Sequence, residues 1–409
     1  MTSALTLTPP SLSVSTASTA TRFDFFRSIE AAGREWDAAA PAANVFLQRP
    51  YLAVLEATPP LGMRFGYLVF YQDENPVGVA LCQIKYFKGD DNISESEHEA
   101  GREACFFTGL AKWLKRRVAG MVAADILICG NMLLTGEHGY YFDYQKISPE
   151  KAIELLEKSL VEVVARMERE GVRMPAILIK DLMPEHLGQG KYLVSRDFVE
   201  FDIQPNMVMD LPFRDFNEYL AAMSTKYRTR AKRAFKKGEG FVKKELSLAD
   251  AQRELPRIYE LYRYIATNAG FNMVDLNEQY LIALKEHFAP AFRIFGYYLD
   301  DQLLAFYTTI QNGDELEAHF LGYDKVHNHD LQLYQNILYD IVRIGIESGC
   351  HQIVFARTAL EIKSSVGATP RDLWCYLRLQ NSFANKFTGT VLDYLKPVEE
   401  WQARHPFKD

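Results

Sequence analysis

The sequence predicts an α/β protein of two tandem halves, each a mixed β-sheet flanked by helices. One succession of elements, a hairpin, a strand, a helix and a further strand, occurs twice along the chain. With 409 residues the chain is also too long for one hydrophobic core of usual size, and 48% apolar side chains suffice for two. Together these observations predict a pair of layered α/β domains.

The repeat begins with a hairpin in each half. Residues 65–86 and 295–310 each contain two β-runs around a turn, and both open on Phe-Gly-Tyr. The first turn is DENP at 73–76, whose residues favour chain reversal. A strand is then expected at 125–134 in the first half and at 315–323 in the second.

A helix and a short buried strand complete each copy. In the first half a Ser-Pro pair at 148–149 marks a helix start, and apolar residues recur at helical spacing until Gly171. Residues 331–348 show the same periodicity in the second half. The strands that follow are PAILIKD at 175–181 and HQIVFAR at 351–357.

The repeat divides the chain into a Ser/Thr/Pro-rich tail at 1–22, expected to be disordered, a first domain at 23–205 and a second at 206–409. The tail lacks the basic start and apolar block of a secretory signal, and no apolar run reaches the ~20 residues of a spanning helix. We therefore expect a cytoplasmic protein without a transmembrane segment.

Charge and cysteine usage exclude several classes of function. The formal net charge of −7 gives no global preference for nucleic acid or an anionic membrane, so a basic surface must be local. The five cysteines never form a C-x-x-C pair, and His327, His329 and Asp330 have no third ligand at a suitable spacing. We expect reduced thiols and no metal site.

Three stretches carry a family likeness: NVFLQRPYLAVLE at 44–56, MSTKYRTRAKRAFKKG at 223–238, and the Lys-x-x-apolar-Gly segment KSSVG at 363–367. They resemble the GNAT superfamily of N-acyltransferases. The doubling resembles its tandem branch, the FemABX-like proteins that attach amino acids to peptidoglycan precursors. The resemblance implies two tandem GNAT-like domains and an activated acyl donor, which in this wider group is acyl-CoA, acyl carrier protein or aminoacyl-tRNA.

One feature departs from the family pattern. GNAT enzymes that use acetyl-CoA usually hold its pyrophosphate with a glycine-bearing loop at a helix N-terminus. The corresponding segment here, KVHNHD at 325–330, has no glycine, and Asp330 can act as a helix cap. In the first half GEHG at 136–139 lies far ahead of its helix. We therefore expect the acyl donor to be bound without the usual glycine-bearing loop. We also expect the first half to be a structural or acceptor-binding copy of the domain.

The strand at 315–323 carries candidate acid–base residues. Glu315, Glu317 and His319 alternate with apolar residues and so share one face of the strand. We predict Glu317 or His319 as the group that accepts a proton from an attacking amine. The solvent face of an antiparallel strand would show the same alternation. Tyr323, at the end of this strand, is assigned to substrate or cofactor binding.

Lys363 and Arg357 are predicted as cations that bind an anion or the developing oxyanion, since they lie near the carboxyl end of the last core strand. Glu361 is expected to orient Lys363 as an ion pair, although a solvated surface pair would look the same. On this interpretation Lys363→Ala abolishes transfer and leaves the melting temperature nearly unchanged.

Lys226, Arg230, Arg233 and Lys237 are spaced four, three and four, which places them on one stripe of a helix. Seven cations lie between 226 and 237 with no acid among them. Such a helix can bind a polyphosphate, an RNA backbone, an acidic carrier protein or a membrane surface, or it can be an ordinary solvated face.

The leading prediction is an N-acyltransferase with its transfer site in the second half. It would use an acyl-CoA or acyl carrier protein thioester and a small-molecule or lipid-precursor amine. An aminoacyl-tRNA-dependent transferase acting on a cell-wall precursor and a non-catalytic binding protein are the alternatives.

Overall fold

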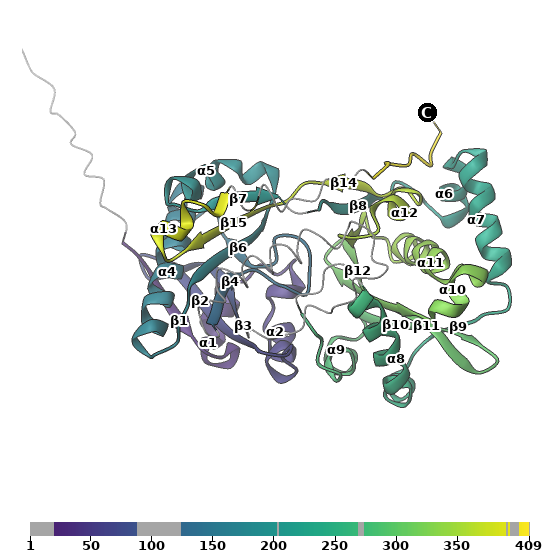
Figure 1. The fold of residues 1–409 in the computed structure, drawn as a ribbon, viewed down its shortest axis with the longest axis horizontal. Helices are drawn as coiled ribbons and strands as arrows, with labels where there is room; N and C mark the ends of the chain where they lie inside the picture. Colours follow the sequence, from purple (N-terminus) through teal and green to yellow (C-terminus); the bar gives the residue numbers. More distant parts are fainter. Residues whose placement is uncertain are drawn as a thin grey trace, which may run out of the picture.

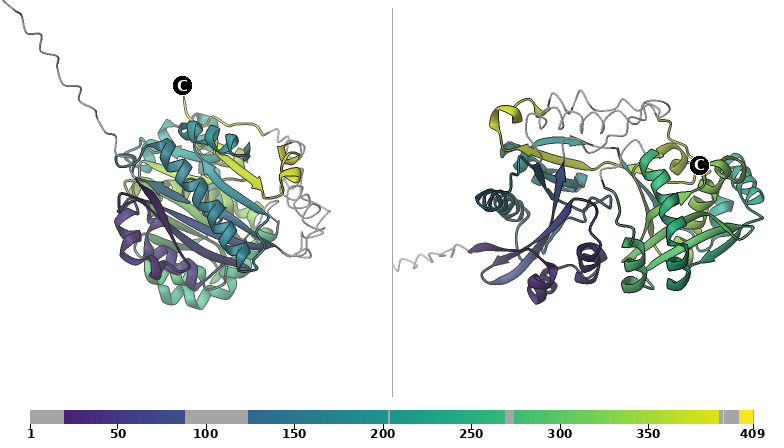
Figure 2. Two further views of the ribbon diagram at one scale, coloured as in Figure 1. Left: turned by 90° about the vertical axis from the view of Figure 1, so that its left-hand side faces the viewer. Right: turned by 60° about the horizontal axis from the view of Figure 1, so that its bottom comes forward.

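The computed structural model describes residues 20–87, 124–202, 204–268, 274–389, 392 and 401–408. Within them the chain forms two mixed β-sheets whose domains lie side by side along the long axis (Figures 1 and 2). Most of the predicted disordered tail lies outside the described residues. Thr21 and Arg22, which we assigned to the tail, instead begin the first strand, where Arg22 pairs with Glu74 at 2.6 Å.

The first sheet has the order β1-β2-β3-β4-β6-β15-β7, with β5 paired to β3. Only β4 and β6 are parallel among these pairs. The strands are β1 (Thr21–Phe26), β2 (Met63–Gln72), β3 (Asn75–Phe87), β4 (Ala124–Cys129), β5 (Tyr140–Phe142), β6 (Ala176–Leu182), β7 (Val199–Asp202) and β15 (Trp374–Leu379).

The second sheet has the order β14-β8-β13-β12-β11-β10-β9, and its one parallel pair is β12 with β13. Each sheet thus contains one strand–helix–strand crossover after a hairpin, as the repeat predicted. The strands are β8 (Asn206–Asp210), β9 (Val242–Glu245), β10 (Phe292–Leu299), β11 (Gln302–Asn312), β12 (Glu315–Tyr323), β13 (Gln352–Ala356) and β14 (Thr369–Arg371).

Helices pack on both faces of each sheet. In the first half α4 and α5 cover one face and α1 and α2 the other; in the second half α6, α7 and α11 lie opposite α8 and α9. The helices are α1 (Ile29–Ala39), α2 (Arg49–Ala57), α4 (Pro149–Arg169), α5 (Leu187–Ser195), α6 (Phe216–Ala222), α7 (Thr225–Lys237), α8 (Leu248–Asn268), α9 (Tyr280–Phe288), α10 (Lys325–Leu331), α11 (Leu333–Glu347), α12 (Leu360–Ser364) and α13 (Ser382–Asn385).

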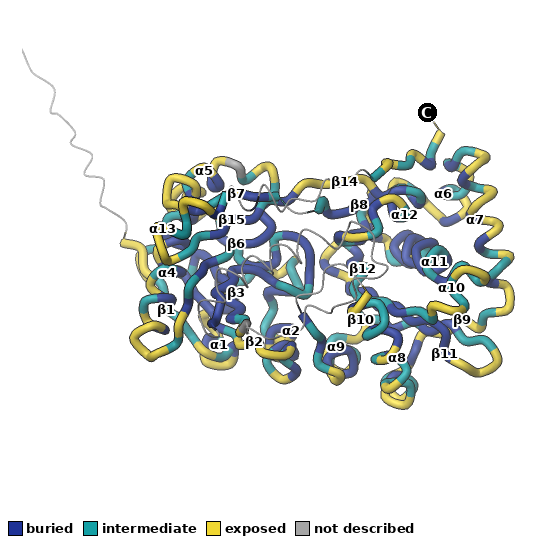
Figure 3. The backbone as a smooth tube through the Cα atoms, viewed as in Figure 1, coloured by how far each residue is buried: buried dark blue, intermediate teal, exposed yellow. Residues whose placement is uncertain are grey.

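One hydrophobic core is shared by the two halves. Trp36 and Leu52 of the first half belong to the same buried cluster as Leu284, Phe292 and Phe306 of the second. Burial of each such side chain stabilises the fold by roughly 1.5–3 kcal/mol, so separation of the halves would expose a costly apolar surface. Figure 3 shows the strands buried in both halves and exposed residues on outer helices such as α7.

Equivalent turns close the two predicted hairpins. Asp73 and Glu74 have φ angles of 48° and 65°, and Asp300 and Asp301 have φ angles of 49° and 60°. Two consecutive left-handed residues match the right-handed twist of the strands, and aspartate enters this region more readily than most residues. The predicted hairpins are present in both halves.

Two expected elements have different limits. The strand predicted at 125–134 stops at Cys129, because a loop folds back so closely that a Cβ on Gly139 would lie 2.5 Å from the Cα of Gly130. The helix predicted at 331–348 begins at Leu333, because Gln332 is left-handed with a φ of 49° and separates α11 from the short α10.

The C-terminal part of the chain returns to the first sheet. β15 lies between β6 and β7, where Arg378 donates to Glu157 of α4 at 2.9 Å and Tyr376 donates to Glu200 at 2.7 Å. The domain limits of 23–205 and 206–409 stay a prediction. β15 lies after residue 206 in the sequence but belongs to the sheet of the first half. The sequence analysis did not identify β15.

Candidate active site at the junction of the two halves

β12 separates from its parallel neighbour at the predicted acid–base residues. Backbone pairing with β13 covers Glu315 to Glu317, whereas β12 continues to Tyr323. On its other edge β12 pairs with β11, and this pairing contains a β-bulge. At the bulge two residues of β12, His319 and Phe320, lie opposite one residue of β11, Thr308. This bulge changes the direction of the side chains that follow it. Glu317 is thus the last residue of β12 that is paired with β13.

Glu317 faces a histidine from the first half. Its side chain is 4% exposed, and its Oε1 lies 3.6 Å from Nε2 of His138, too far for a hydrogen bond. Within the described residues this oxygen has no hydrogen-bond partner. Burial raises the pKa of Glu317, and His138 opposes that shift only in part. A carboxylate with a raised pKa is a stronger proton acceptor than an exposed one.

Asn44 determines which nitrogen of His138 faces Glu317. The amide Nδ2 of Asn44 lies 3.4 Å from Nδ1 of His138 and can only donate, so Nδ1 accepts. When the ring holds a single proton, that proton is on Nε2, the nitrogen that faces Glu317. His138 can therefore stabilise the ionised form of Glu317 without carrying a charge itself.

His319 belongs to a polar chain that crosses the junction. Its Nε2 lies 3.3 Å from the Tyr280 hydroxyl and its Nδ1 lies 3.2 Å from the Thr308 hydroxyl. Tyr280 contacts Tyr51 at 3.3 Å, and Asn131 donates to Tyr51 at 3.1 Å. Burial lowers the pKa of His319 to about 3, so the ring is neutral at pH 7. Of the two predicted proton acceptors, the geometry favours Glu317.

An open groove of about 580 Å³ lies beside these residues and is lined by both halves. Asn44, Tyr140 and Tyr144 line it from the first half, and Asn312 and Glu315 from the second. Asn44 also contacts His138, and Glu315 shares a strand face with Glu317. Glu317 and His138 do not line the groove themselves, but Asn44 and Glu315 connect its lining to that pair, and the groove has the size of a small-molecule site.

Lys363 is buried and bonded to the main chain. Its side chain is 6% exposed, and Nζ donates to the carbonyl oxygens of Arg357 at 2.6 Å and Ala356 at 3.2 Å. Burial lowers the pKa of Lys363 to about 7. The expected Glu361–Lys363 ion pair is wrong, because Glu361 lies on the exposed side of α12 and pairs with Arg404 at 3.0 Å. Lys363 therefore ties α12 to the end of β13.

Arg357 is paired across the two halves. Its guanidinium binds the carboxylate of Asp181 and donates through Nε to the carbonyl of Gln204 at 2.9 Å. Asp181 also binds Lys180 and accepts from the backbone of Gly136 at 3.0 Å. Burial alone would raise the pKa of Asp181, but the charges of Arg357 and Lys180 lower it to about 2. The geometry gives Arg357 a positioning role; anion binding by Arg357 stays a prediction.

α10 occupies the place where the phosphate-binding loop was expected. Asp324 caps α10 by accepting from two backbone N–H groups of its first turn. Asp330, predicted to cap the 331–348 helix, does not do so, because the N-cap residue of α11 is Gln332, which forms no side-chain cap hydrogen bond. Asn328 then accepts from the N–H of Tyr334 in the first turn of α11 at 3.0 Å. One of the amides that would hold a pyrophosphate is thus already bonded within the protein.

The profile of the acetyltransferase (GNAT) domain family matches residues 225–364, from the start of α7 to the end of α12. This part of the chain is a GNAT domain. The match confirms the predicted class of GNAT N-acyltransferase, and it includes Glu317, His319 and Lys363. Comparison with curated proteins gives no match.

Solved structures support the same fold for the whole chain. The crystal structure of FemX is 11% identical, covers 90% of this chain and 100% of its own, and has a TM-score of 0.53. A tandem GNAT protein from the clavulanic acid biosynthesis pathway is 10% identical, with coverages of 88% and 98% and a TM-score of 0.50. The predicted fold of two tandem GNAT-like domains is confirmed.

The basic helix α7 opens the GNAT domain on its outer side (Figure 1). Lys226, Arg230 and Arg233 are exposed, and Lys237 donates to the carbonyl of His329 in α10 at 3.3 Å. In the described part of the chain no ion pair involves any of the seven cations of α7. The stripe is as predicted, and its C-terminal end reaches the region that precedes α11.

The remaining predicted features lie away from the junction or are absent from the described structure. Tyr323 is half-buried and packs against Tyr334 of α11, with ring centroids 5.7 Å apart; its role in binding stays a prediction. The described residues contain no group of three metal-binding side chains and no helix long and apolar enough to cross a membrane. Four described cysteines are free and buried, and Cys105 lies outside the described residues.

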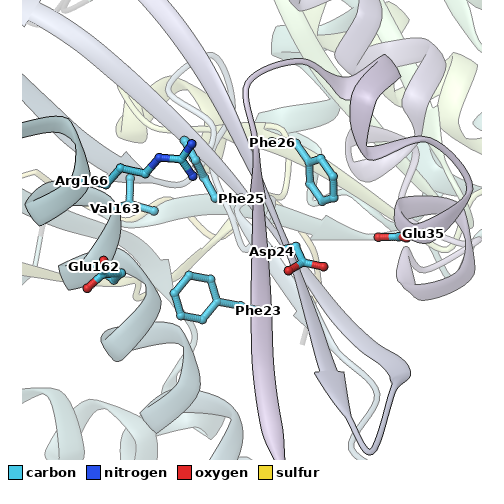
Figure 4. A pocket seen from close by; sticks show the side chains of 8 residues that line it. All are labelled: Phe23, Asp24, Phe25, Phe26, Glu35, Glu162, Val163 and Arg166. Atoms are coloured by element: carbon cyan, nitrogen blue, oxygen red, sulfur yellow. The ribbon is translucent and has the colours of Figure 1, made fainter. Parts of the chain in front are cut away.

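A second hollow of about 470 Å³ lies in the first half between β1 and α4. Phe23, Phe25 and Arg166 line it (Figure 4), and none of the predicted site residues does. It lies in the half outside the matched GNAT domain, and we assign it no catalytic role.

Sequence reasoning missed the partners that the first half contributes. His138 was noted only within GEHG at 136–139, and Tyr51, Asn44 and Asp181 were not singled out. A histidine between two glycines was the available signal, but its partner Glu317 is far along the chain. Only the packing of the halves brings them together.

Proposed function

We propose that this protein is an N-acyltransferase in which Glu317 accepts the proton of an attacking amine at the junction of the two halves. The amine nitrogen attacks the thioester carbonyl of the donor, the C–N bond forms and the C–S bond breaks. Glu317 takes the proton released by the nitrogen. The departing thiolate takes up one proton from solvent, and Glu317 then releases its own to solvent, so the carboxylate is ionised again and one thiol leaves. Nε2 of His138 faces the ionised carboxylate at 3.6 Å, without a hydrogen bond.

One observation carries this assignment. Glu317 is a buried carboxylate with an unbonded oxygen, on the strand that separates from its parallel neighbour in the GNAT domain, beside an open groove. A purely structural carboxylate at this depth would be expected to have its hydrogen bonds satisfied. A buried carboxylate oxygen without a hydrogen-bond partner is suited to accept a proton.

The donor is proposed to carry phosphate groups that bind near α7. The stripe of Lys226, Arg230, Arg233 and Lys237 is free of acidic partners among the described residues, and its C-terminal end lies beside α10. Because Asn328 occupies an amide of α11, a CoA pyrophosphate would need these side chains in place of a backbone loop. The fold shared with the tandem GNAT protein of the clavulanic acid biosynthesis pathway, whose structure was determined without acetyl-CoA, makes CoA thioesters the first donors to test.

The proton acceptor is tested by Glu317→Gln in a thiol-release assay with acetyl-CoA and a set of amines. General-base catalysis predicts a fall in kcat/KM of about 10²–10⁴-fold. In the unmodified protein kcat/KM should rise with pH as Glu317 loses its proton, with a midpoint above the ordinary glutamate value because burial raises the pKa. Glu168→Gln, on the exposed side of α4, is the control. Unchanged kcat/KM in Glu317→Gln would exclude this role.

The donor alternatives are separated by a thermal-shift panel of acetyl-CoA, long-chain acyl-CoA, acyl carrier protein and tRNA. A shift with an acyl-CoA or with acyl carrier protein that Arg230→Gln/Arg233→Gln removes supports the proposed donor site. A shift with tRNA alone, falling steeply with salt, supports the aminoacyl-tRNA alternative suggested by the fold shared with FemX. Binding without turnover of any donor would favour the non-catalytic alternative.

A further inference from the structure

β1 forms an open edge of the first sheet. It pairs with β2 on one side, and no other strand of the described residues pairs with it. Figure 1 shows β1 at the outer end of the first half, whereas α7 lies at the opposite end of the molecule. The edge is therefore separate from the candidate active site at the junction of the two halves.

β1 is the longest of the four strands that end the two described sheets. It has six residues, of which three are phenylalanines, and it contains neither lysine nor proline. β7 and β9 have four residues each and β14 has three; β9 carries two lysines, and β14 contains Pro370. Short length, lysine and proline are among the means by which proteins prevent an edge strand from pairing with another chain. β1 has none of these three features.

The backbone groups of every second residue of β1 point away from β2. Antiparallel pairing alternates between residues that exchange hydrogen bonds with their partner and residues that do not. Asp73 donates its N–H to the carbonyl of Ala20, the residue before β1, at 3.0 Å, so the even-numbered residues of β1 bond to β2. The N–H and C=O groups of the odd-numbered residues therefore face the open edge, where no described strand pairs with them. These residues are Thr21, Phe23 and Phe25.

We propose that this edge pairs antiparallel with β1 of a second copy of the chain, about a twofold axis at Phe23. The axis must pass through a residue, because an axis between two residues would place outward-facing groups of one copy opposite inward-facing groups of the other. With the axis at Phe23 the odd-numbered residues of the two copies bond to one another. The first sheets of the two copies then form one continuous sheet.

Charge selects this register over its neighbours. With the axis at Phe23, Arg22 of each copy lies opposite Asp24 of the other. An axis at Arg22 would place two arginines opposite each other, and an axis at Asp24 would place two aspartates there. Opposite charges in such cross-strand pairs are favourable, and like charges are unfavourable. Asp24 accepts from Arg22 of its own chain at 2.7 Å and has capacity for a further bond, since a carboxylate can accept several.

The hollow between β1 and α4 offers space for a side chain of the second copy. Its volume is about 470 Å³, and Phe23, Phe25 and Val163 line it (Figure 4). Opposed residues of antiparallel strands point to the same face of the sheet, so the two Phe23 side chains lie next to each other in the proposed register. Aromatic pairs of this kind stabilise a sheet. Phe23 of one copy therefore packs at the hollow of the other.

Exchange of the two charges tests the interface. Size-exclusion chromatography with light scattering of the full chain should give, as concentration rises, twice the chain mass of 46.8 kDa. Asp24→Lys and Arg22→Glu each place like charges opposite each other, so each alone should raise the dimer dissociation constant by about tenfold or more. An equal mixture of the two variants should dimerise again, because each then meets unlike charges on the other.

Two further variants separate the edge from general effects on the fold. Thr21→Pro removes an outward-facing N–H and no bond to β2, so it should weaken the dimer and leave thermal unfolding, followed by circular dichroism, nearly unchanged. Glu168→Lys, on the exposed side of α4, is the matched control and should leave the dimer unchanged.

Three results overturn the inference. The first is the mass of a single chain at every concentration that stays soluble. The second is a dimer that Thr21→Pro and both charge variants leave unchanged, which would place the contact on another surface. The third is a mixture of Asp24→Lys with Arg22→Glu that stays monomeric although both variants are folded, which would exclude the register centred on Phe23.

Discussion

Replacement of the buried Lys363 by methionine should change the pH dependence of stability in a defined direction. The folded protein holds Lys363 at a pKa of about 7, because burial disfavours its charged form. In the unfolded chain a lysine has a pKa of about 10.4. Between these values the unfolded state binds one more proton than the folded state at this residue. The free energy of unfolding therefore rises with pH across this window, by up to about 1.4 kcal/mol per pH unit.

The magnitude follows from that slope. From pH 7.5 to pH 9 the wild-type protein should gain up to about 2 kcal/mol relative to Lys363→Met, which has no group to titrate there. The cysteine and tyrosine side chains also titrate in this pH range, but they are the same in the wild type and in Lys363→Met. Their contribution therefore cancels when the two free energies of unfolding are subtracted. At pH 7.5 the variant also leaves the carbonyls of Ala356 and Arg357 without their donor, and each unsatisfied carbonyl costs about 1–3 kcal/mol.

Urea unfolding followed by circular dichroism at pH 7.5, 8.2 and 9 measures this difference. Lys226→Met, at an exposed position of α7, is the matched control and should show no pH-dependent difference from wild type. A Lys363→Met difference that stays constant across the three pH values would refute the buried titrating lysine. The sequence predicted that Lys363→Ala leaves the melting temperature nearly unchanged. Because Lys363 is buried and donates to two carbonyl groups, we now expect this substitution to lower the melting temperature.

Further substitutions test the junction and the packing around β12. Arg357→Leu should lower the free energy of unfolding by about 3–5 kcal/mol in urea, since it removes a buried partner of Asp181; a loss below 1 kcal/mol would contradict the buried pair. Gly322→Ala should cost about 1–3 kcal/mol, because its Cβ would lie 2.6 Å from the backbone of Leu261 in α8. Gly188→Ala, exposed in α5 with nothing within 4 Å, is its control and should be neutral or stabilising. Equal losses for the two glycines would show that contact with α8 does not limit the site.

The elements of each half could be predicted because their signals are local. The Ser-Pro start of α4, the left-handed turn at Asp73 and the apolar spacing of α11 each depend on neighbouring residues. β15 was not found, because its place between β6 and β7 depends on contacts such as Arg378 with Glu157, more than 200 residues apart. A six-residue apolar strand carries no sequence signal of which sheet it joins.

The site shows the same division between local and distant information. Strand alternation placed Glu315 and Glu317 on one face, and helical spacing placed the cations of α7 in a stripe. The sequence could not show that Lys363 points inward to two carbonyl groups, since a basic residue after a strand more often faces solvent. Nor could it show that His138 reaches Glu317, because that contact requires the two halves to pack.

Surfaces of opposite charge lie on different parts of the chain. α7 lies on the outer edge of the GNAT domain (Figure 1). Four carboxylates line the groove, to which both halves contribute residues. A phosphate-bearing donor is attracted to α7 and repelled by the carboxylates of the groove. The net charge of −7 is a sum over the whole chain and does not show the seven cations gathered on α7. Raised salt should therefore weaken donor binding, and the α7 variant Arg230→Gln/Arg233→Gln should weaken it as well. Donor binding that neither raised salt nor this variant changes would show that α7 is not the donor surface.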